Sequence, residues 1–306
     1  MKKLLLICCL ATMLMAQGKI GGVTYFDFTY DDSSAFNFSR QYFSYGMDVS
    51  EDVQFNVIFD VSRAPDDSQL LVFLKKAQVD YSCSWGKSSL GLIGTNTYGV
   101  QEKNWGYRFI EKSAIDKNGF SPTADLGIGF SRNLMDQLNL SLQIVNGEGF
   151  KSAQSDKYHK IALNTTYGDR NLTKNDGFNA GLVYTTEQTD GDPTTMTSLF
   201  SGFSGRGLRL GAEFDLLNTG ITESQLISVN GNYNIIEKIA AFVRYDIFDK
   251  DTSLPNNEQN DLIVGIVLNC GSGLSLAPHL RVEDSFDDDG KDKSDMIYKI
   301  NCQFKF

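Results

Sequence analysis

The chain has 306 residues, with 28 Lys or Arg and 38 Asp or Glu, so its formal net charge at pH 7 is -10. This acidic balance argues against nucleic acid as a partner. After the first residues, no segment approaches the roughly 18 apolar residues that a membrane helix needs. Glycine is abundant (28 residues), proline is scarce (5), and aromatic residues make up 12%. This composition suits strands joined by tight turns.

The N-terminal segment has the features of an export signal. A pair of lysines precedes an apolar run from Leu4 to Leu10, and further apolar residues reach Ala16. A positive start, a short apolar core and a small residue at the cleavage point are typical of secretory signals. We therefore expect residues 1–16 to be removed and residues 17–306 to form one domain.

Segments of alternating apolar and polar residues follow one another along the rest of the chain. In the clearest of them, Val53 to Val61, the apolar side chains occupy the odd positions. Successive side chains of a strand face opposite sides, so such a segment has one apolar and one polar wall. The period slips near residues 35 and 195, which predicts β-bulges there. We expect strands to begin near residues 19, 35, 53, 69, 88, 124, 138, 157, 178, 195, 208, 222, 238, 261, 274 and 295.

The connections between these segments fall into two classes. Short turns alternate with longer polar loops, the longest being residues 95–123. This loop joins the fifth and sixth expected strands and carries charges of both signs among Trp105, Tyr107 and Phe109. A loop of that composition suits the inside of a polar tube, so we expect it to fold inward. Its predicted constriction residues are Glu102, Lys103, Arg108, Glu111, Lys112 and Lys117.

The phase of each strand also predicts which charged residues face the lumen. The two signs nearly cancel on that side. Facing rows of opposite charge set the field across a pore, and Arg209, Arg244 and Arg281 fall on alternate strands. Two arrangements of these arginines stay open. They could form a row of positive charge along the pore wall, or nearby carboxylates could neutralise them. The predicted pore-wall residues are Arg40, Arg209, Arg244, Arg281, Asp246 and Glu283.

The C-terminal segment, residues 298–306, alternates strictly and ends on Phe306. A closing strand with a terminal aromatic residue is typical of bacterial outer-membrane barrels. Such barrels have an even number of strands, each about 9–11 residues long. The sequence therefore predicts an all-β fold, a transmembrane antiparallel up-and-down barrel of about 16 strands with its third external loop folded inward.

Several segments carry a more specific resemblance. Residues 104–112, the glycine-rich segment 146–149 and residues 36–40 resemble bacterial porins related to the phosphate-selective (O/P type) group. The resemblance implies a water-filled diffusion channel in the outer membrane, commonly a trimer.

Cysteine and acidic residues give no sign of a metal site or cofactor. Cys83, Cys270 and Cys302 would remain after export, an odd number at scattered positions, so we expect free thiols. The acidic segment 284–292 fails as a calcium loop, because Met296 would occupy the place of the bidentate Glu. A solvated external loop is the expected alternative.

We expect a bacterial outer-membrane porin that passes small hydrophilic solutes or ions, with anions such as phosphate among the candidates. Its partners would be outer-membrane lipid, the solutes and two further copies in a homotrimer. One alternative is a non-conducting barrel that serves as an adhesin or structural anchor. The other is a barrel enzyme that uses His159 as a general base, although we expect no enzymatic activity.

Overall fold

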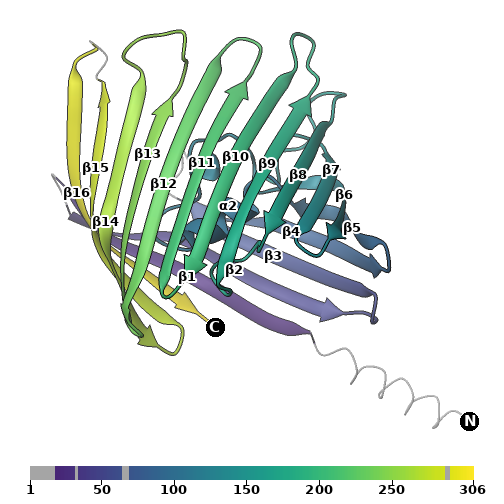
Figure 1. Cartoon of the computed structure of the whole chain (residues 1–306), viewed down its shortest axis with the longest axis horizontal. Helices are drawn as coiled ribbons and strands as arrows, with labels where there is room; N and C mark the ends of the chain where they lie inside the picture. Colours follow the sequence, from purple (N-terminus) through teal and green to yellow (C-terminus); the bar gives the residue numbers. More distant parts are fainter. Residues whose placement is uncertain (1–17, 32–33, 64–68, 287–289) are drawn as a thin grey trace, which may run out of the picture.

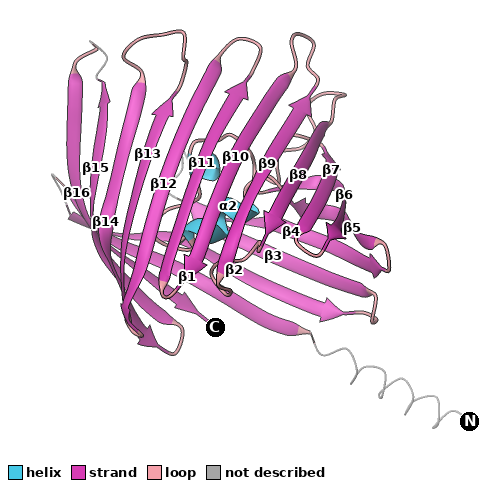
Figure 2. Ribbon diagram, viewed as in Figure 1, coloured by secondary structure: helices cyan, strands magenta, loops and turns pink. Residues whose placement is uncertain are grey.

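The computed structural model describes residues 18–31, 34–63, 69–286 and 290–306. The expected export signal, residues 1–16, lies outside the described residues. Within the described ranges, sixteen strands pair with their sequence neighbours, and β1 pairs with β16 to close the barrel. All pairs are antiparallel, and the strands form one continuous wall (Figures 1 and 2). The expected fold class is therefore confirmed.

The strands begin within three residues of the expected positions. Their bounds are β1 Lys19–Tyr30, β2 Ser34–Asp48, β3 Val53–Arg63, β4 Leu70–Cys83, β5 Gly86–Gly94, β6 Ala124–Met135, β7 Leu138–Val145, β8 Lys160–Gly168, β9 Gly177–Glu187, β10 Thr194–Gly205, β11 Leu208–Asn218, β12 Glu223–Ile236, β13 Ile239–Asp249, β14 Glu258–Gly271, β15 Leu274–Phe286 and β16 Asp292–Lys305.

One of the two expected bulges is present. Tyr25 pairs with Arg40 and the next residue, Phe26, pairs with Phe38, so Ser39 is the extra residue of β2. The bulge expected near residue 195 is wrong, because β10 pairs in regular register with both neighbours. The sequence period slips in β10 for another reason. Met196 and Phe200 point inward and are covered by the loop, so both faces of this strand are partly apolar.

A further bulge lies in β4. Ile58 pairs with Lys76 and Phe59 pairs with Leu74, which leaves Lys75 as the extra residue. A bulge re-aims the side chains of its strand. Lys75 is therefore only 8% exposed and belongs to the lumen side, as does its neighbour Lys76.

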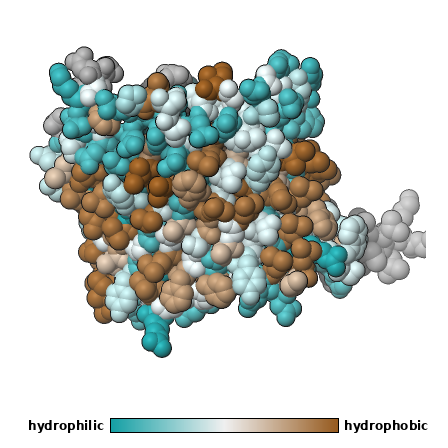
Figure 3. Space-filling view, turned by 45° about the horizontal axis from the view of Figure 1, so that its top comes forward, coloured by the Kyte–Doolittle hydropathy of each residue, from teal (hydrophilic) through white to brown (hydrophobic). Residues whose placement is uncertain are grey.

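The outside of the barrel is apolar. Side chains such as Leu90, Leu126 and Val264 point outward and are between 42% and 60% exposed. Figure 3 shows apolar side chains over the wall and hydrophilic ones gathered at the end that carries the long loops. An apolar band between polar ends is the surface that a transmembrane barrel presents to lipid. Among the helices of the described residues, none is long and apolar enough to cross a membrane.

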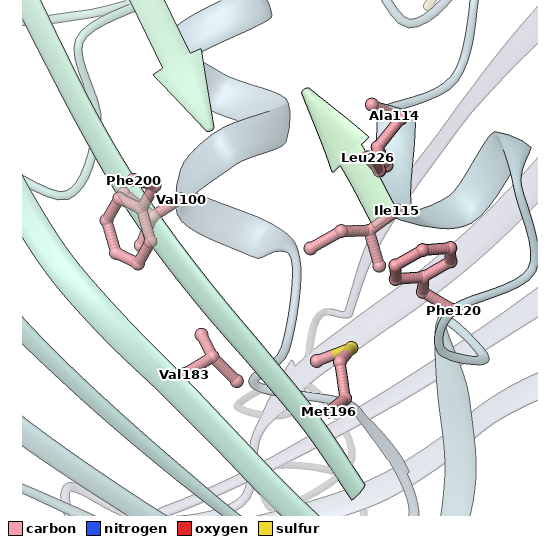
Figure 4. Packing of buried hydrophobic residues seen from close by; sticks show 8 residues of the cluster. All are labelled: Val100, Ala114, Ile115, Phe120, Val183, Met196, Phe200 and Leu226. Carbon is pink, nitrogen blue, oxygen red and sulfur yellow. The ribbon is translucent and has the colours of Figure 1, made fainter. Parts of the chain in front are cut away.

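The loop 95–123 folds into the barrel, as expected, and carries α2 (Gly99–Trp105) and α3 (Ala114–Lys117) (Figures 1 and 2). Its apolar side chains pack on the inner wall in two clusters. The first joins both helices to β9, β10 and β12 (Figure 4): Val100, Ala114, Ile115, Phe120, Val183, Met196, Phe200 and Leu226. The second joins the middle of the loop to β13, β14 and β15: Trp105, Phe109, Ile110, Ala240, Phe242, Ile263, Val267 and Ala277. Both clusters place the loop on one side of the lumen.

Candidate functional site

Helix α2 is held against the wall by amide hydrogen bonds. The side-chain amides of Asn104 and Asn179 exchange two hydrogen bonds of 2.9 Å. Nε2 of Gln101 donates to Oγ of Ser198 at 3.2 Å. A Cβ at Gly202 would lie 2.6 Å from the Asn104 amide, so glycine allows the helix to approach β10 closely. Helix α2 therefore packs on strands β9, β10 and β11.

Arg209, expected on the pore wall, holds the C-terminal end of α2. Its Nε donates to the carbonyl oxygen of Asn104, and its Nη2 donates to that of Trp105, both at 3.2 Å. Gly106 ends the helix at φ +79°, and a Cβ there would collide with the guanidinium. A cation beside the last carbonyls of a helix is stabilising. Arg209 is therefore a contact of the loop.

Arg244 and Asp246 are placed differently from the expectation of pore-wall residues. Arg244 is 1% exposed and Asp246 is 2% exposed, because the loop covers both. Nη2 of Arg244 lies 2.7 Å from Asp246, and Nη1 donates to the carbonyl oxygen of Lys112 at 2.5 Å. The guanidinium also stacks on the ring of Trp105 at 5.3 Å. This pair ties the loop to β13 and does not face the lumen water.

Arg281 joins a network of carboxylates. Its guanidinium contacts Glu111 of the loop at 3.0 Å, Asp261 at 2.8 Å and Glu283 at 2.7 Å. Lys117 of α3 also pairs with Asp261. Burial raises the pKa of Glu111, but Arg281 and Lys117 lower it more, so its carboxyl titrates below the usual range. Arg244 and Arg281 thus pair with carboxylates, whereas Arg209 contacts backbone carbonyls of the loop.

The opposite face of the loop looks toward β1–β4. Arg108 pairs with Glu102 and, at 2.8 Å, with Asp116, so the loop orients its guanidinium from within. Nη2 of Arg108 reaches across to the hydroxyl of Tyr42 on β2 at 3.4 Å. This contact joins the free face of the loop to the far wall.

Tyr42 receives further cationic donors from its own side. Nη1 of Arg40 lies 3.1 Å from the hydroxyl oxygen of Tyr42, and Nζ of Lys75 lies 3.2 Å from it. Asp60, which is fully buried, lies 3.4 Å from Arg40 and 3.8 Å from Lys75. Arg40, Lys75 and Arg108 therefore converge on one phenol oxygen where the loop meets the wall. We call this group the Tyr42 cluster.

The remaining predicted constriction residues line cavities on either side of the Tyr42 cluster. Lys112 lines a cavity of about 180 Å³ together with Arg40, Arg108 and Lys299. Lys103 lines a cavity of about 410 Å³ between α2 and β4–β7, together with Lys76, Lys87 and Arg170. Burial, and then Arg170, lowers the pKa of Lys103. Open space therefore borders the loop along β1–β7, and a further cavity of about 250 Å³ lies between the middle of the loop and β12–β16.

Sequence reasoning missed several charged residues on the lumen side, among them Lys75, Asp261, Lys87 and Arg170. The bulge in β4 conceals Lys75, and the adjacent Lys75 and Lys76 in an alternating strand are the signal that could have found it. Asp261 was missed because β14 begins at Glu258, three residues before the expected start. Lys151 comes from the next external loop and lies 4.5 Å from the ring of Phe73. Burial lowers its pKa, and repulsion from Arg40 lowers it further.

The two histidines of the described ranges occupy different environments, and the three cysteines are unpaired. His159 is exposed, with Nδ1 2.6 Å from the carbonyl oxygen of Tyr158. His279 is buried on the lumen side against the ring of Phe242. Cys83, Cys270 and Cys302 are free thiols, as expected. Across the ranges that the structure describes, no three His, Cys, Asp or Glu side chains are grouped to hold a metal ion.

The barrel was compared with known protein families, curated proteins and solved structures. No protein-family model and no curated protein matches the chain. Among solved structures, the outer membrane channel DcaP of Acinetobacter baumannii matches with a TM-score of 0.69, 14% identity, and 96% and 98% coverage of the two chains. The anion-selective porin from Comamonas acidovorans matches with a TM-score of 0.64, 12% identity, and 95% and 100% coverage. The trimer form of OmpT, an outer membrane protein of Vibrio cholerae, matches with a TM-score of 0.65, 11% identity, and 95% and 99% coverage of the two chains.

The chain therefore has the fold of bacterial outer-membrane porins. The similarity covers nearly the whole length of each chain but, at identities of 11% to 14%, establishes the fold alone. Membership of the phosphate-selective group does not follow from it. The properties of the pore must be argued from the side chains of this chain.

Proposed function

We propose that the protein is a diffusion channel of the bacterial outer membrane that passes small hydrophilic solutes and favours small anions, phosphate among them. Residues 1–16 would direct export and be removed. The observation that carries the proposal is the Tyr42 cluster, in which Arg40, Lys75 and Arg108 meet where the inward loop reaches the opposite wall.

The size of the barrel supports a channel. Sixteen strands enclose more space than side chains fill, whereas about eight do not. The loop packs on the inner wall along β9–β15. Cavities of about 370, 180 and 410 Å³ lie along β1–β7, and one of about 250 Å³ lies between the loop and β12–β16. Charged side chains border all four cavities. A non-conducting adhesin or anchor would not need this polar path.

The sign of the charges along that path supports anions. Lys112 lines one cavity with Arg40 and Arg108, and Lys76 and Lys103 line another, so the cations outnumber the carboxylates Asp27, Glu102 and Glu111 of these linings. Asp60 and Glu102 offset part of this charge but are paired with Arg40, Lys75 and Arg108. Charged rings that line a pore select ions of the opposite sign. The excess of basic groups therefore favours anions despite the acidic chain as a whole.

We extend the proposal to a homotrimer, because OmpT of Vibrio cholerae forms a trimer with the same fold. An enzyme based on His159 gains little support, since the nearest partner of its Nδ1 is a backbone carbonyl and not a nucleophile.

Reversing the charge of the predicted constriction tests the proposal. Arg108→Glu and Lys112→Glu should each shift the reversal potential of the reconstituted channel under a salt gradient toward cation preference. Lys157→Glu makes the same charge change on an exposed external loop, where the Lys157 side chain is 74% exposed, and should leave the potential unchanged. If Arg108→Glu behaves like this control, the side chain does not line the ion path.

A further inference from the structure

The cavity below the Tyr42 cluster has an unusual lining for a porin lumen. Its volume is about 370 Å³, and it lies between the loop and β1–β4. Tyr25, Tyr42, Tyr98 and Ile58 supply apolar surface. The charged groups of the lining are Lys75, Arg108, Lys305 and Glu102. The interior of a porin is usually polar and filled with water. An aromatic cavity with two convergent cations is instead typical of a ligand-binding site.

The aromatic walls of this cavity are fixed in place. The rings of Tyr25 and Tyr42 meet edge to face, with centroids 6.1 Å apart and an interplanar angle of 85°. The hydroxyl of Tyr98 donates to the carbonyl oxygen of Thr123 at 3.3 Å. Burial raises the pKa of Tyr98, so its ring stays a neutral wall. The cavity thus keeps preformed apolar faces on both the loop and the barrel side.

The cations that line the cavity outnumber its one carboxylate side chain, Glu102. Arg108 pairs with Glu102 and Asp116, whereas Lys75 lies 3.8 Å from its nearest carboxylate, Asp60. Nζ of Lys75 and Nη2 of Arg108 lie 3.2 Å and 3.4 Å from the Tyr42 hydroxyl oxygen, which also accepts from Arg40. A phenol oxygen is a neutral acceptor, whereas an ionised carboxylate forms roughly twice as strong a bond with such donors. The hydrogen-bond acceptor of Lys75 here is the Tyr42 hydroxyl. A ligand carboxylate at this end of the cavity would therefore bind Lys75 better than the hydroxyl does, and Arg108 and Lys305 would add to its attraction.

We propose that this cavity binds small aromatic carboxylates, which would make them preferred solutes of the channel. The carboxylate would lie against Lys75 and Arg108, and the ring would pack on Tyr25, Tyr98 and Ile58. An apolar cavity of about 150 Å³ holds a benzene ring, so about 370 Å³ accommodates one ring with its carboxylate. Inorganic phosphate would use the cations but not the apolar faces. This inference rests on the proposed channel function and names its solute class.

Current recordings with benzoate test the inference without any mutation. In single channels bathed in potassium chloride, millimolar benzoate should interrupt or reduce the ion current. Acetate has the charge without the ring, benzyl alcohol has the ring without the charge, and inorganic phosphate has charge alone. Each should be at least about tenfold less effective, the factor that corresponds to 1.4 kcal/mol. If acetate acts at the same concentration as benzoate, the ring has no site and the inference is overturned.

Two substitutions test whether benzoate blocks the current from this cavity. Ile58→Asn should weaken the benzoate block, because it removes apolar surface from the cavity wall. Lys75→Gln should weaken it as well, whereas Lys87→Gln, a lysine that pairs with Asp80 beside the other cavity, should not. A block that survives both Ile58→Asn and Lys75→Gln would place benzoate elsewhere and overturn the inference.

Failure of the channel proposal gives a different result. If the inserted protein shows no openings, the channel is refuted, and calorimetric binding of benzoate to the detergent-solubilised protein then decides the site. Binding that is lost in Lys75→Gln and kept in Lys87→Gln would support the site. Absence of binding would overturn it.

Discussion

Arg244 is the clearest case of a side chain whose role is set by burial. It is 1% exposed and connects Asp246, Trp105 and the carbonyl oxygen of Lys112. A buried ion pair is not a reliable source of stability by itself, but removal of one partner leaves a buried charge unpaired. The contribution of Arg244 is therefore to keep Asp246 neutralised while the loop lies on β13.

We predict that Arg244→Ala destabilises the folded barrel by about 3–5 kcal/mol, since Asp246 would remain buried without a partner. Urea unfolding of the protein refolded into lipid vesicles measures this change. Lys250→Ala, in an exposed loop, serves as the control and should change the free energy of unfolding by less than about 0.5 kcal/mol. A similar, small effect of both substitutions would contradict the role assigned to Arg244.

The lowered pKa of Glu111 leads us to expect that the stability of the fold decreases at acid pH. Although burial raises it, Arg281 and Lys117 hold the pKa of this carboxyl below its usual value of 4.5 in the folded protein. A group of this kind stabilises the fold fully above the unfolded pKa, and that contribution is lost as the pH falls through the lower, folded value. We expect the stability of the wild type to fall more steeply below pH 4.5 than that of Glu111→Gln. Unfolding midpoints across this pH range would measure the difference, with Glu237→Gln in an exposed turn as the control.

At the scale of elements, the close approach of α2 to β10 depends on Gly202. A Cβ at this position would lie 2.6 Å from the Asn104 amide, which is the partner of Asn179. The position of the constriction therefore depends on a strand outside the pore path.

Gly202→Ala should displace α2 and cost about 1–3 kcal/mol, the usual price of overpacking. The displaced loop should also make single-channel current noisier than in the wild type. Gly46→Ala adds the same methyl group in β2, where the nearest atom to its Cβ would be 3.9 Å away, and should leave both quantities unchanged. Equal current noise in the two variants would show that α2 does not depend on this contact.

The strands were predictable from the sequence, whereas the wall residues that contact the inward loop were not. Alternation is a local property, so starts such as those of β3 and β11 follow from side chains of the same strand. The bulge at Lys75 depends on pairing with β3, and the loop carbonyls that Arg209 and Arg244 contact lie more than a hundred residues away in the sequence. The sequence therefore predicted an inward loop and its charged residues, but not which cations the loop would cover.

For the whole molecule, the ion preference of the channel depends on where the charges lie and not on the net charge of the chain. The chain carries a net charge of -10, yet the path along β1–β7 is bordered by Arg40, Lys75 and Arg108. Carboxylates such as Asp246 and Asp261 lie instead beneath the loop, paired with Arg244, Arg281 and Lys117. The loop thus separates a neutralised seat on one wall from a basic path on the other.

The most direct test of this account is the single-channel conductance of the refolded protein in a planar bilayer, with the reversal potential under a salt gradient. We predict stepwise openings and a reversal potential that indicates anion preference, because basic groups exceed acidic ones along the open side of the lumen. Openings with cation preference would contradict the assigned path. Correct insertion without openings would contradict the channel itself and favour an adhesin or structural anchor.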